Sequence, residues 1–107
     1  MNKYGAVRTE VDGIAFASKK EARRYSELRL MERAGEITAL SLQPRFPLFV
    51  NGSQVCTYVG DFQYLIPADQ GARPERVVED AKGMKTPMYR LKAKMFAAQY
   101  GFPIVEV

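Results

Sequence analysis

The spacing of apolar and polar residues predicts two helices, each with a clear signal at its start. Ser18-Lys19-Lys20-Glu21 has the form of a capping box, a serine followed three residues later by glutamate, and predicts a helix over residues 18–34. Thr86-Pro87 predicts a second helix over residues 86–100, because threonine favours the N-cap and proline the first helical position. A glycine directly follows each helical pattern, as is common at a helix end.

Between and after the helices, apolar runs predict strands. Residues 37–50 form a first strand that its prolines break or place at a sheet edge, and Asn51-Gly52 is a strong hairpin-turn signal after it. Residues 55–66 and 76–82 form the second and third strands. The remaining segments are an exposed loop and a short last strand, at 67–74 and 102–107.

The order of these elements, α-β-β-β-α-β, predicts the fold class. Three successive strands pair readily as an antiparallel meander, and a helix that crosses over to the last strand makes the sheet mixed. We therefore expect an α/β (α+β) fold with a mixed sheet flanked by two helices. Residues 1–17 form an N-terminal arm with a small hairpin that turns at Asp12-Gly13, and residues 18–107 form a single domain.

Charged residues at the ends of two apolar strands are the candidate chemistry of the chain. In the third strand, two valines run directly into Glu79 and Asp80, and Lys82 follows after an alanine. Asp61 comes directly after an apolar run of the second strand and a glycine. Because residues two apart on a strand share a face, Asp80 and Lys82 face one side of the sheet and Glu79 faces the other. A hairpin between these strands would bring Asp61 beside Asp80 and Lys82.

A divalent cation would reconcile two acidic side chains that meet in one pocket. Neighbouring carboxylates repel each other, and an isolated buried charge is costly. Mg²⁺, or Mn²⁺ in its place, takes oxygen ligands, and Mg²⁺ often keeps waters and phosphate oxygens beside one or two carboxylates. Lys82 would then stabilise a phosphate or help to deprotonate a water, which is the chemistry of metal-assisted phosphodiester hydrolysis. The alternative is an exposed Asp80–Lys82 ion pair, which contributes about 0–1 kcal/mol to stability.

Glu21 is a further acidic candidate with two interpretations. On the first helix it projects to the same side as Tyr25 and Leu28, so it can point towards the sheet. A capping box also requires glutamate at this position, for backbone reasons only. The sequence leaves the catalytic and the capping interpretation open.

The second helix combines an apolar arc with several basic residues. Lys92 projects inside the arc, which is unusual for lysine unless its ammonium group meets anions at a cleft. Lys85, Arg90 and Lys94 lie outside the arc and, with Lys82, form a basic run. Phosphate binding and a solvated helix face both fit this run. The arc, which we expect to face the core, consists of Met88, Leu91, Met95, Phe96 and Ala98.

Composition narrows the functional classes. The chain has no histidine, which excludes a Ser-His-Asp triad, a histidine zinc site and a nuclease with a histidine general base. One cysteine, Cys56, cannot form an internal disulfide, and its place in a strand predicts a structural thiol. Sixteen Lys and Arg against twelve Asp and Glu give a net charge of +4, which weakly favours a nucleic-acid partner. With neither a secretory signal nor a membrane-spanning run, we expect a soluble cytoplasmic protein.

The acidic residues and their surroundings resemble a known nuclease superfamily. Gly60-Asp61 and Asp80-Ala81-Lys82, preceded by a helix with Glu21, are similar to the motif of the PD-(D/E)XK nucleases, in which Gly60 replaces the proline. The core of that superfamily, as in restriction endonucleases, has the order α-β-β-β-α-β. More narrowly, the runs SKKEARRY, GEITALSLQPRF, YVGDFQY and VVEDAKG resemble a small phage and prophage family that is itself similar to Holliday-junction resolvases.

The resemblance implies a role for each acidic candidate. Asp61 and Asp80 would be metal ligands, and Lys82 would assist the water and the scissile phosphate. Glu21 matches the acidic residue that many members supply from their first helix. Asp80 stands where glutamate is commoner, so a bulge in the third strand would make Glu79 the alternative ligand.

The resemblance also implies a substrate and partners. We expect a Mg²⁺- or Mn²⁺-dependent DNA endonuclease of phage or prophage origin, a possible homodimer, which acts on branched or recombination intermediates. Gln43 and Lys92 are weaker candidates for contacts with phosphate or water. The alternatives are a catalytically inactive nucleic-acid-binding module of the same fold and a small phage assembly protein. An RNase H-like nuclease fits poorly, because that fold opens with a long hairpin carrying its first aspartate.

Overall fold

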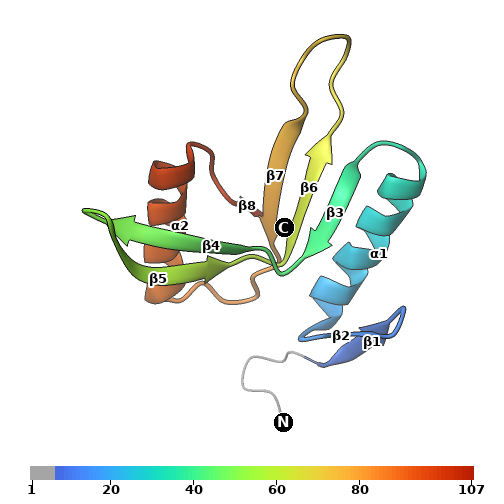
Figure 1. Ribbon diagram of the computed structural model, residues 1–107. Coiled ribbons are helices and arrows are strands. Elements are labelled where there is room, and N and C mark those ends of the chain that lie inside the picture. Colours follow the sequence, from blue (N-terminus) through green and yellow to red (C-terminus); the bar gives the residue numbers. More distant parts are fainter. Residues whose placement is uncertain (1–6) are drawn as a thin grey trace.

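Four strands form the central sheet of the protein, which a computed structural model describes for residues 7–107 (Figure 1). They are β3 (Thr38–Leu42), β6 (Phe62–Ile66), β7 (Glu75–Asp80) and β8 (Val105–Glu106), in this spatial order. β3, β6 and β7 pair antiparallel, and β8 lies parallel to β7. The helix α2 (Pro87–Tyr100) crosses over between β7 and β8, which confirms a mixed sheet in an α+β protein.

The first two predicted strands each divide near the middle. β4 (Arg45–Val50) and β5 (Ser53–Val59) leave the central sheet and pair with each other as a separate hairpin. Its turn, Asn51-Gly52, has left-handed φ angles of 49° and 81°, which confirms the hairpin signal. The prediction of one continuous strand over residues 55–66 was therefore wrong.

A corner of the backbone causes this division. Gln43 has a left-handed φ of 50°, and Gly60 packs so closely that an added Cβ would lie 3.1 Å from Val78 Cγ1. The Gln43 N–H donates to the Asp61 carbonyl, and the Gly60 N–H donates to the Pro44 carbonyl; both hydrogen bonds are 3.0 Å long. Asp61 therefore sits where the chain leaves the hairpin and enters the central sheet.

Both helices begin at their predicted caps. In α1 (Lys19–Arg33), the Ser18 hydroxyl accepts a hydrogen bond of 3.1 Å from the Glu21 N–H. In α2, the Thr86 hydroxyl accepts one of the same length from the Tyr89 N–H. Both helix starts lie near the end of β7, since Ser18, Thr86 and Asp80 line the same pocket.

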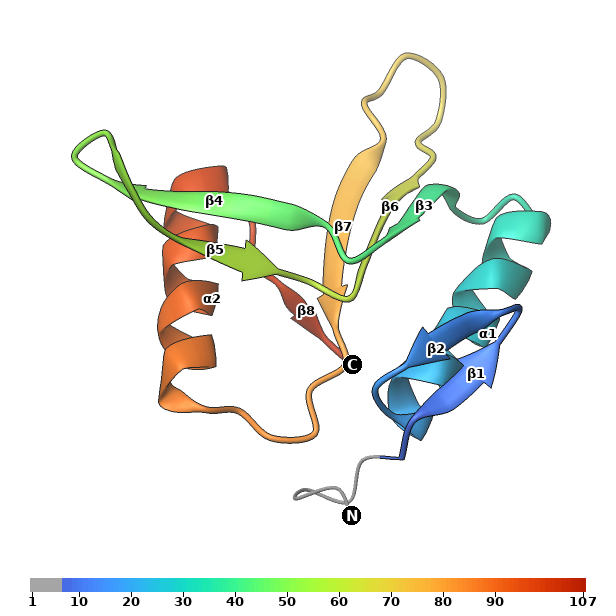
Figure 2. The same cartoon turned by 60° about the horizontal axis from the view of Figure 1, so that its bottom comes forward.

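The predicted N-terminal hairpin forms β1 (Thr9–Val11) and β2 (Ile14–Phe16) and lies against α1 (Figure 2). Its turn has left-handed φ angles at Asp12 and Gly13, as predicted from the Asp-Gly pair. The Tyr25 hydroxyl on α1 donates to the Asp12 carboxylate over 3.1 Å and ties the turn to the helix.

The two helices cover opposite faces of the central sheet (Figures 1 and 2). Val77 and Val78 are neighbours on β7, yet they pack into different cores, because side chains alternate along a strand. The core beside α1 contains Phe16, Ala22, Tyr25, Leu28, Ile37, Phe62, Tyr64 and Val77. The core beside α2 and the β4–β5 hairpin contains Phe46, Leu48, Tyr58, Val78, Tyr89 and Phe96.

The predicted core-facing arc of α2 holds at Phe96 and in part at Met95, which packs against the core, and was wrong at Met88, Leu91 and Ala98. Tyr89 and Phe96 are buried, whereas Met88 and Leu91 are more than half exposed. Apolar residues occur all around this helix, so the projection could not select a face. The β4–β5 hairpin selects it, because Phe46 offers an aromatic surface on which the Phe96 ring packs edge-on, with centroids 4.9 Å apart.

Cys56 is half-buried in β5. Residues 67–74 are exposed, as predicted for a loop. Within residues 7–107, no helix has the length and the apolar character that a membrane crossing requires.

Candidate active site

A pocket of about 440 Å³ gathers the acidic candidates and the lysine from three places in the fold. Glu21 comes from the first turn of α1, Asp61 from the corner before β6, and Asp80 from the end of β7. Lys82 follows two residues after Asp80, and Lys20 lies beside it in the pocket wall. Residues far apart in the sequence are thus brought to one end of the central sheet.

Backbone hydrogen bonds hold Asp61 against the end of β7. Its N–H donates to the Glu79 carbonyl over 3.0 Å. Its Oδ2 accepts a hydrogen bond of 2.7 Å from the Ala81 N–H. A carboxylate that accepts a backbone N–H has a defined orientation, which leaves the other oxygen of Asp61 for a ligand.

Asp80 is almost fully buried, and a tyrosine orients it. The Tyr58 hydroxyl donates to Asp80 Oδ2 over 2.7 Å, and Lys82 Nζ lies 3.7 Å from Oδ1. Burial raises the pKa of Asp80 to about 7, and the Asp61 charge also raises it, although the Tyr58 hydrogen bond and the Lys82 charge oppose them. The pocket therefore holds a carboxylate whose charge is incompletely compensated by the protein.

This raised pKa predicts an unusual pH dependence of stability in metal-free protein. A folded-state pKa above the unfolded value means that the folded state binds the proton more tightly, so stability falls as pH rises from about 4 towards 7. Asp80→Asn removes this ionisation and keeps an acceptor for Tyr58. We expect the variant to be more stable than the wild type at pH 8, by on the order of 2 kcal/mol, and nearly equal to it at pH 4.

Urea unfolding in EDTA at several pH values measures this difference. Asp69→Asn, in the exposed loop, is the matched control and should follow the wild-type profile. Parallel profiles for Asp80→Asn and the wild type would contradict the assignment.

Glu21 lines the pocket from the first turn of α1. It is 9% exposed, and burial raises its pKa, as does the Asp61 charge; a backbone hydrogen bond from Ala17 and the Lys82 charge oppose this shift. The bond that caps the helix is made by the Glu21 N–H to Ser18 Oγ, whereas the Glu21 side chain lines the pocket. Glu21 thus lies in one pocket with Asp61 and Lys82, whose charges act on its carboxyl group.

Lys82 is held between an acid and an aromatic ring. Its Nζ lies 4.9 Å from the centroid of the Tyr89 ring and 3.7 Å from Asp80 Oδ1. Lys20 Nζ donates to the Lys82 carbonyl over 3.2 Å, which adds a second ammonium group at the pocket. Sequence reasoning missed Tyr58, Tyr89 and Lys20 as parts of this site, because no local spacing rule connects them with the acids.

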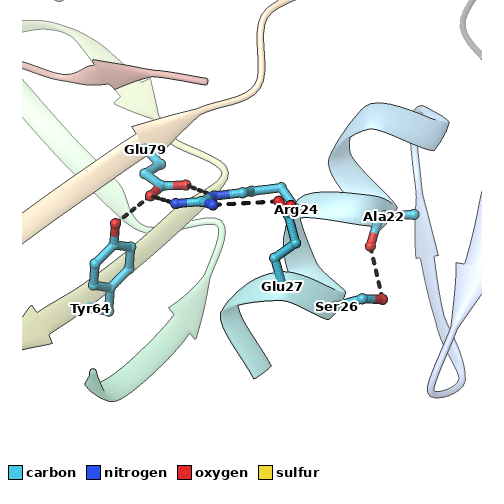
Figure 3. A network of polar contacts seen from close by, with 6 residues as sticks. All are labelled: Ala22, Arg24, Ser26, Glu27, Tyr64 and Glu79. Atoms are coloured by element: carbon cyan, nitrogen blue, oxygen red, sulfur yellow. Dashed lines mark hydrogen bonds and ion pairs between the residues drawn. The ribbon is translucent and has the colours of Figure 1, made fainter. Parts of the chain in front are cut away.

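Glu79 points to the opposite face of the sheet (Figure 3). Arg24 on α1 binds both of its oxygens, with Nε 2.8 Å from Oε1 and Nη2 2.7 Å from Oε2, and the Tyr64 hydroxyl also donates to it. β7 pairs regularly with β6 through Glu79 opposite Phe62, and residues 75–80 contain no bulge that would turn this side chain inward. Glu79 as the alternative metal ligand therefore does not fit this structure.

The predicted nucleic-acid contacts lie in four different settings. Gln43 lines a hollow that it shares with Glu21 and Asp61. Lys92 is half-buried, and its Nζ donates to the Thr57 carbonyl over 3.1 Å. Lys85 is paired with Glu106 over 2.9 Å, so it is not a free cation beside the pocket as the basic run implied. Two further candidates, Arg90 and Lys94, are exposed on α2.

The acidic pair suits a hard divalent cation that retains other ligands. Within residues 7–107, no three acidic, cysteine or histidine side chains lie close enough together to enclose an ion by themselves. Mg²⁺ does not require such a cage, because it binds through one or two carboxylates and completes its octahedron with water and phosphate oxygens. Asp61 and Asp80 supply two carboxylates, each with one oxygen in a hydrogen bond to the protein; the second oxygen of Asp80 lies 3.7 Å from Lys82 Nζ.

The fold and the pocket define a mixed α+β protein with an acidic pair and a lysine at one end of its sheet. The chain matches the model of the family DUF1064, described as "Protein of unknown function", over residues 1–103, and it belongs to this family. The search of curated proteins and the search of solved structures gave no match.

Proposed function

We propose that the protein is a metal-dependent nuclease with a restriction-endonuclease-like αβββαβ core. One observation carries the proposal: Glu21, Asp61, Asp80 and Lys82 converge from separate elements on one pocket. Asp61 and Asp80, with Glu21 beside them, would hold Mg²⁺ or Mn²⁺. A raised pKa at Asp80 supports this use, because a cation would compensate the negative charge that burial disfavours.

Each residue then has a chemical task. When bound, Mg²⁺ supplies a Lewis acid for the phosphoryl oxygen and lowers the pKa of a water ligand. The Tyr58 hydrogen bond fixes Asp80, and the Ala81 N–H fixes Asp61, so the acids are oriented before substrate arrives. Lys82 places an ammonium group next to Asp80, where it would hold the attacking water or the scissile phosphate.

We infer that the substrate is nucleic acid, and that DNA is favoured over RNA. The net charge of +4 and the lysines around the pocket favour a polyanion, and backbone contacts rather than base contacts are expected. Branched or recombination intermediates, a phage or prophage origin and a homodimer are expected through the resemblance alone.

A catalytically inactive nucleic-acid-binding module is the second candidate. Its support is the pair of lysines at the pocket, Lys20 and Lys82, which could bind a phosphate backbone without a metal. Divalent-ion binding separates the two candidates, since only the nuclease requires the acidic pair to bind a cation.

Titration with Mg²⁺ or Mn²⁺, followed by thermal or urea unfolding, is the direct test. A cation that binds only the folded state should stabilise the protein by about 2.7 kcal/mol at a concentration of 100 times Kd. Asp61→Asn/Asp80→Asn should lose this gain, because both proposed ligands are replaced. The charge-matched control, Glu36→Gln/Asp69→Asn, changes two exposed acids and should keep it.

Cleavage assays complete the test. Purified protein is incubated with plasmid, single-stranded DNA and a four-way junction, in Mg²⁺, in Mn²⁺ and in EDTA. Metal-dependent cleavage of any of these substrates supports the nuclease. No stabilisation by either cation together with no cleavage would refute it.

A further inference from the structure

Two further hollows adjoin the acidic pocket, one on each side. A hollow of about 260 Å³ shares Lys82 and Thr86 with the pocket and is also lined by Lys92. A hollow of about 450 Å³ shares Glu21 and Asp61 with the pocket and extends towards the N-terminal hairpin. Because each hollow shares wall residues with the pocket, the three lie next to one another and make a candidate path for a strand, which we call the groove.

Different elements form the two flanks of this groove. In Figure 2, the segment after β7 runs between the N-terminal hairpin on one side and the first turn of α2 on the other. The flank beside α2 contains Lys92 and Thr86, which caps the positive end of that helix. The flank beside the hairpin contains Arg8, which directly precedes β1, and Gln43 from the corner.

Cationic groups are therefore spaced along the groove on both sides of the acids. Lys20 lines the central pocket, and its Nζ donates one hydrogen bond to the Lys82 carbonyl. Lys92 Nζ likewise donates one hydrogen bond to the Thr57 carbonyl. An ammonium group has three donors, so both lysines keep donors for an anionic ligand. Arg8 brings a guanidinium group, whose planar fork suits phosphate oxygens.

We infer that this groove binds a nucleic-acid strand on both sides of the bond to be cut, with Arg8 and Lys20 as phosphate contacts. The inference rests on the proposed function and specifies its substrate class. The substrate is a nucleic-acid strand that extends on both sides of the scissile bond and is bound through its phosphate backbone. The N-terminal hairpin is then part of the binding surface as well as of the core. Cleavage should then be internal, since a strand bound on both sides of the acids does not need a terminus at the site.

Binding without turnover tests the two new contacts. Fluorescence anisotropy with labelled DNA and RNA oligonucleotides is measured in Ca²⁺, from about 50 to 200 mM salt. Arg8→Ala and Lys20→Ala should each weaken binding about 3–10-fold and lower the slope of log K against log salt by about one. Arg8→Lys, which keeps the charge, should retain most of the affinity and the slope.

Arg23→Ala is the matched control, because Arg23 is exposed on α1 and lines neither the pocket nor the two hollows. A drop for Arg8→Ala and Lys20→Ala with either nucleic acid, and none for Arg23→Ala, supports the groove. Equal affinities for all three variants would overturn it, even if the wild type cleaves DNA. Failure of the proposed function has a different result, namely no cleavage and no stabilisation by divalent cations.

Circular single-stranded DNA tests internal cleavage. It has no ends, so linearisation in Mg²⁺ supports a strand that passes through the groove. Degradation of linear DNA with the circle intact would overturn this inference and leave metal-dependent hydrolysis in place.

Discussion

Replacing Lys82 with alanine should lower the rate of metal-dependent cleavage by about 10²–10⁴-fold, the usual contribution of a positioned proton-transfer group. The Lys82 ammonium group lies 3.7 Å from Asp80 Oδ1, so it would contact a water or phosphate oxygen that is bound near the acidic pair. Alanine removes this group and leaves Asp61 and Asp80 in place. The defect should therefore appear in kcat rather than in the binding of the cation.

Two companion measurements make the Lys82 result specific. Lys82→Ala should bind Mg²⁺ at least as tightly as the wild type, because removal of a nearby positive charge reduces repulsion of the cation. Lys19→Ala changes an exposed lysine at the start of α1 and should cleave at the wild-type rate. Full activity in Lys82→Ala would exclude the proposed role, and would also be the result if a contaminating nuclease were present.

Replacing Arg24 with methionine should destabilise the protein by about 3–5 kcal/mol, because it leaves a buried carboxylate without its partner. Glu79 is 1% exposed and receives two hydrogen bonds from the Arg24 guanidinium group (Figure 3). The hydrogen bond to Glu79 is also the main cause that raises the pKa of Arg24. Domains are typically stable by about 5–15 kcal/mol, so the loss is a large fraction of the total.

The double variant Arg24→Met/Glu79→Gln identifies the cause of that loss. It removes the buried charge together with its partner, and the introduced glutamine keeps an acceptor for the Tyr64 hydroxyl, so most of the stability should return. Glu27→Ala is the control, because Glu27 is exposed and its carboxylate lies 3.4 Å from Arg24 Nη1; it should cost less than about 1 kcal/mol. Additive losses in the double variant, measured by urea unfolding, would contradict a buried ion pair.

The ion pair between Arg24 and Glu79 also helps to hold the candidate active site together. Arg24 lies one turn after Glu21 on α1, and Glu79 directly precedes Asp80 on β7. The pair therefore joins the two elements that deliver these acids to the pocket. Weakening it should loosen the site as well as the fold.

Local signals in the sequence were sufficient for the elements and for part of the site. The caps at Ser18 and Thr86 and the turns at Asp12-Gly13 and Asn51-Gly52 depend on a few adjacent residues, so they could be predicted without knowledge of the fold. Strand alternation likewise separated Asp80 from Glu79, because the period of two is a property of any regular strand.

The corner at Gln43 and Gly60 depends on contacts between distant segments and had no complete signal in the sequence. It divides two predicted strands, folds the β4–β5 hairpin over α2 and brings the Tyr58 hydroxyl to Asp80. The same hairpin selects the buried face of α2, which the all-round apolar pattern left ambiguous. Residue type and spacing thus determined the helices, the turns and the acids that share a strand face. The orientation of those acids, their burial and the pairing of Glu79 with Arg24 were set by packing, because each needs a partner that the chain supplies only after it has folded.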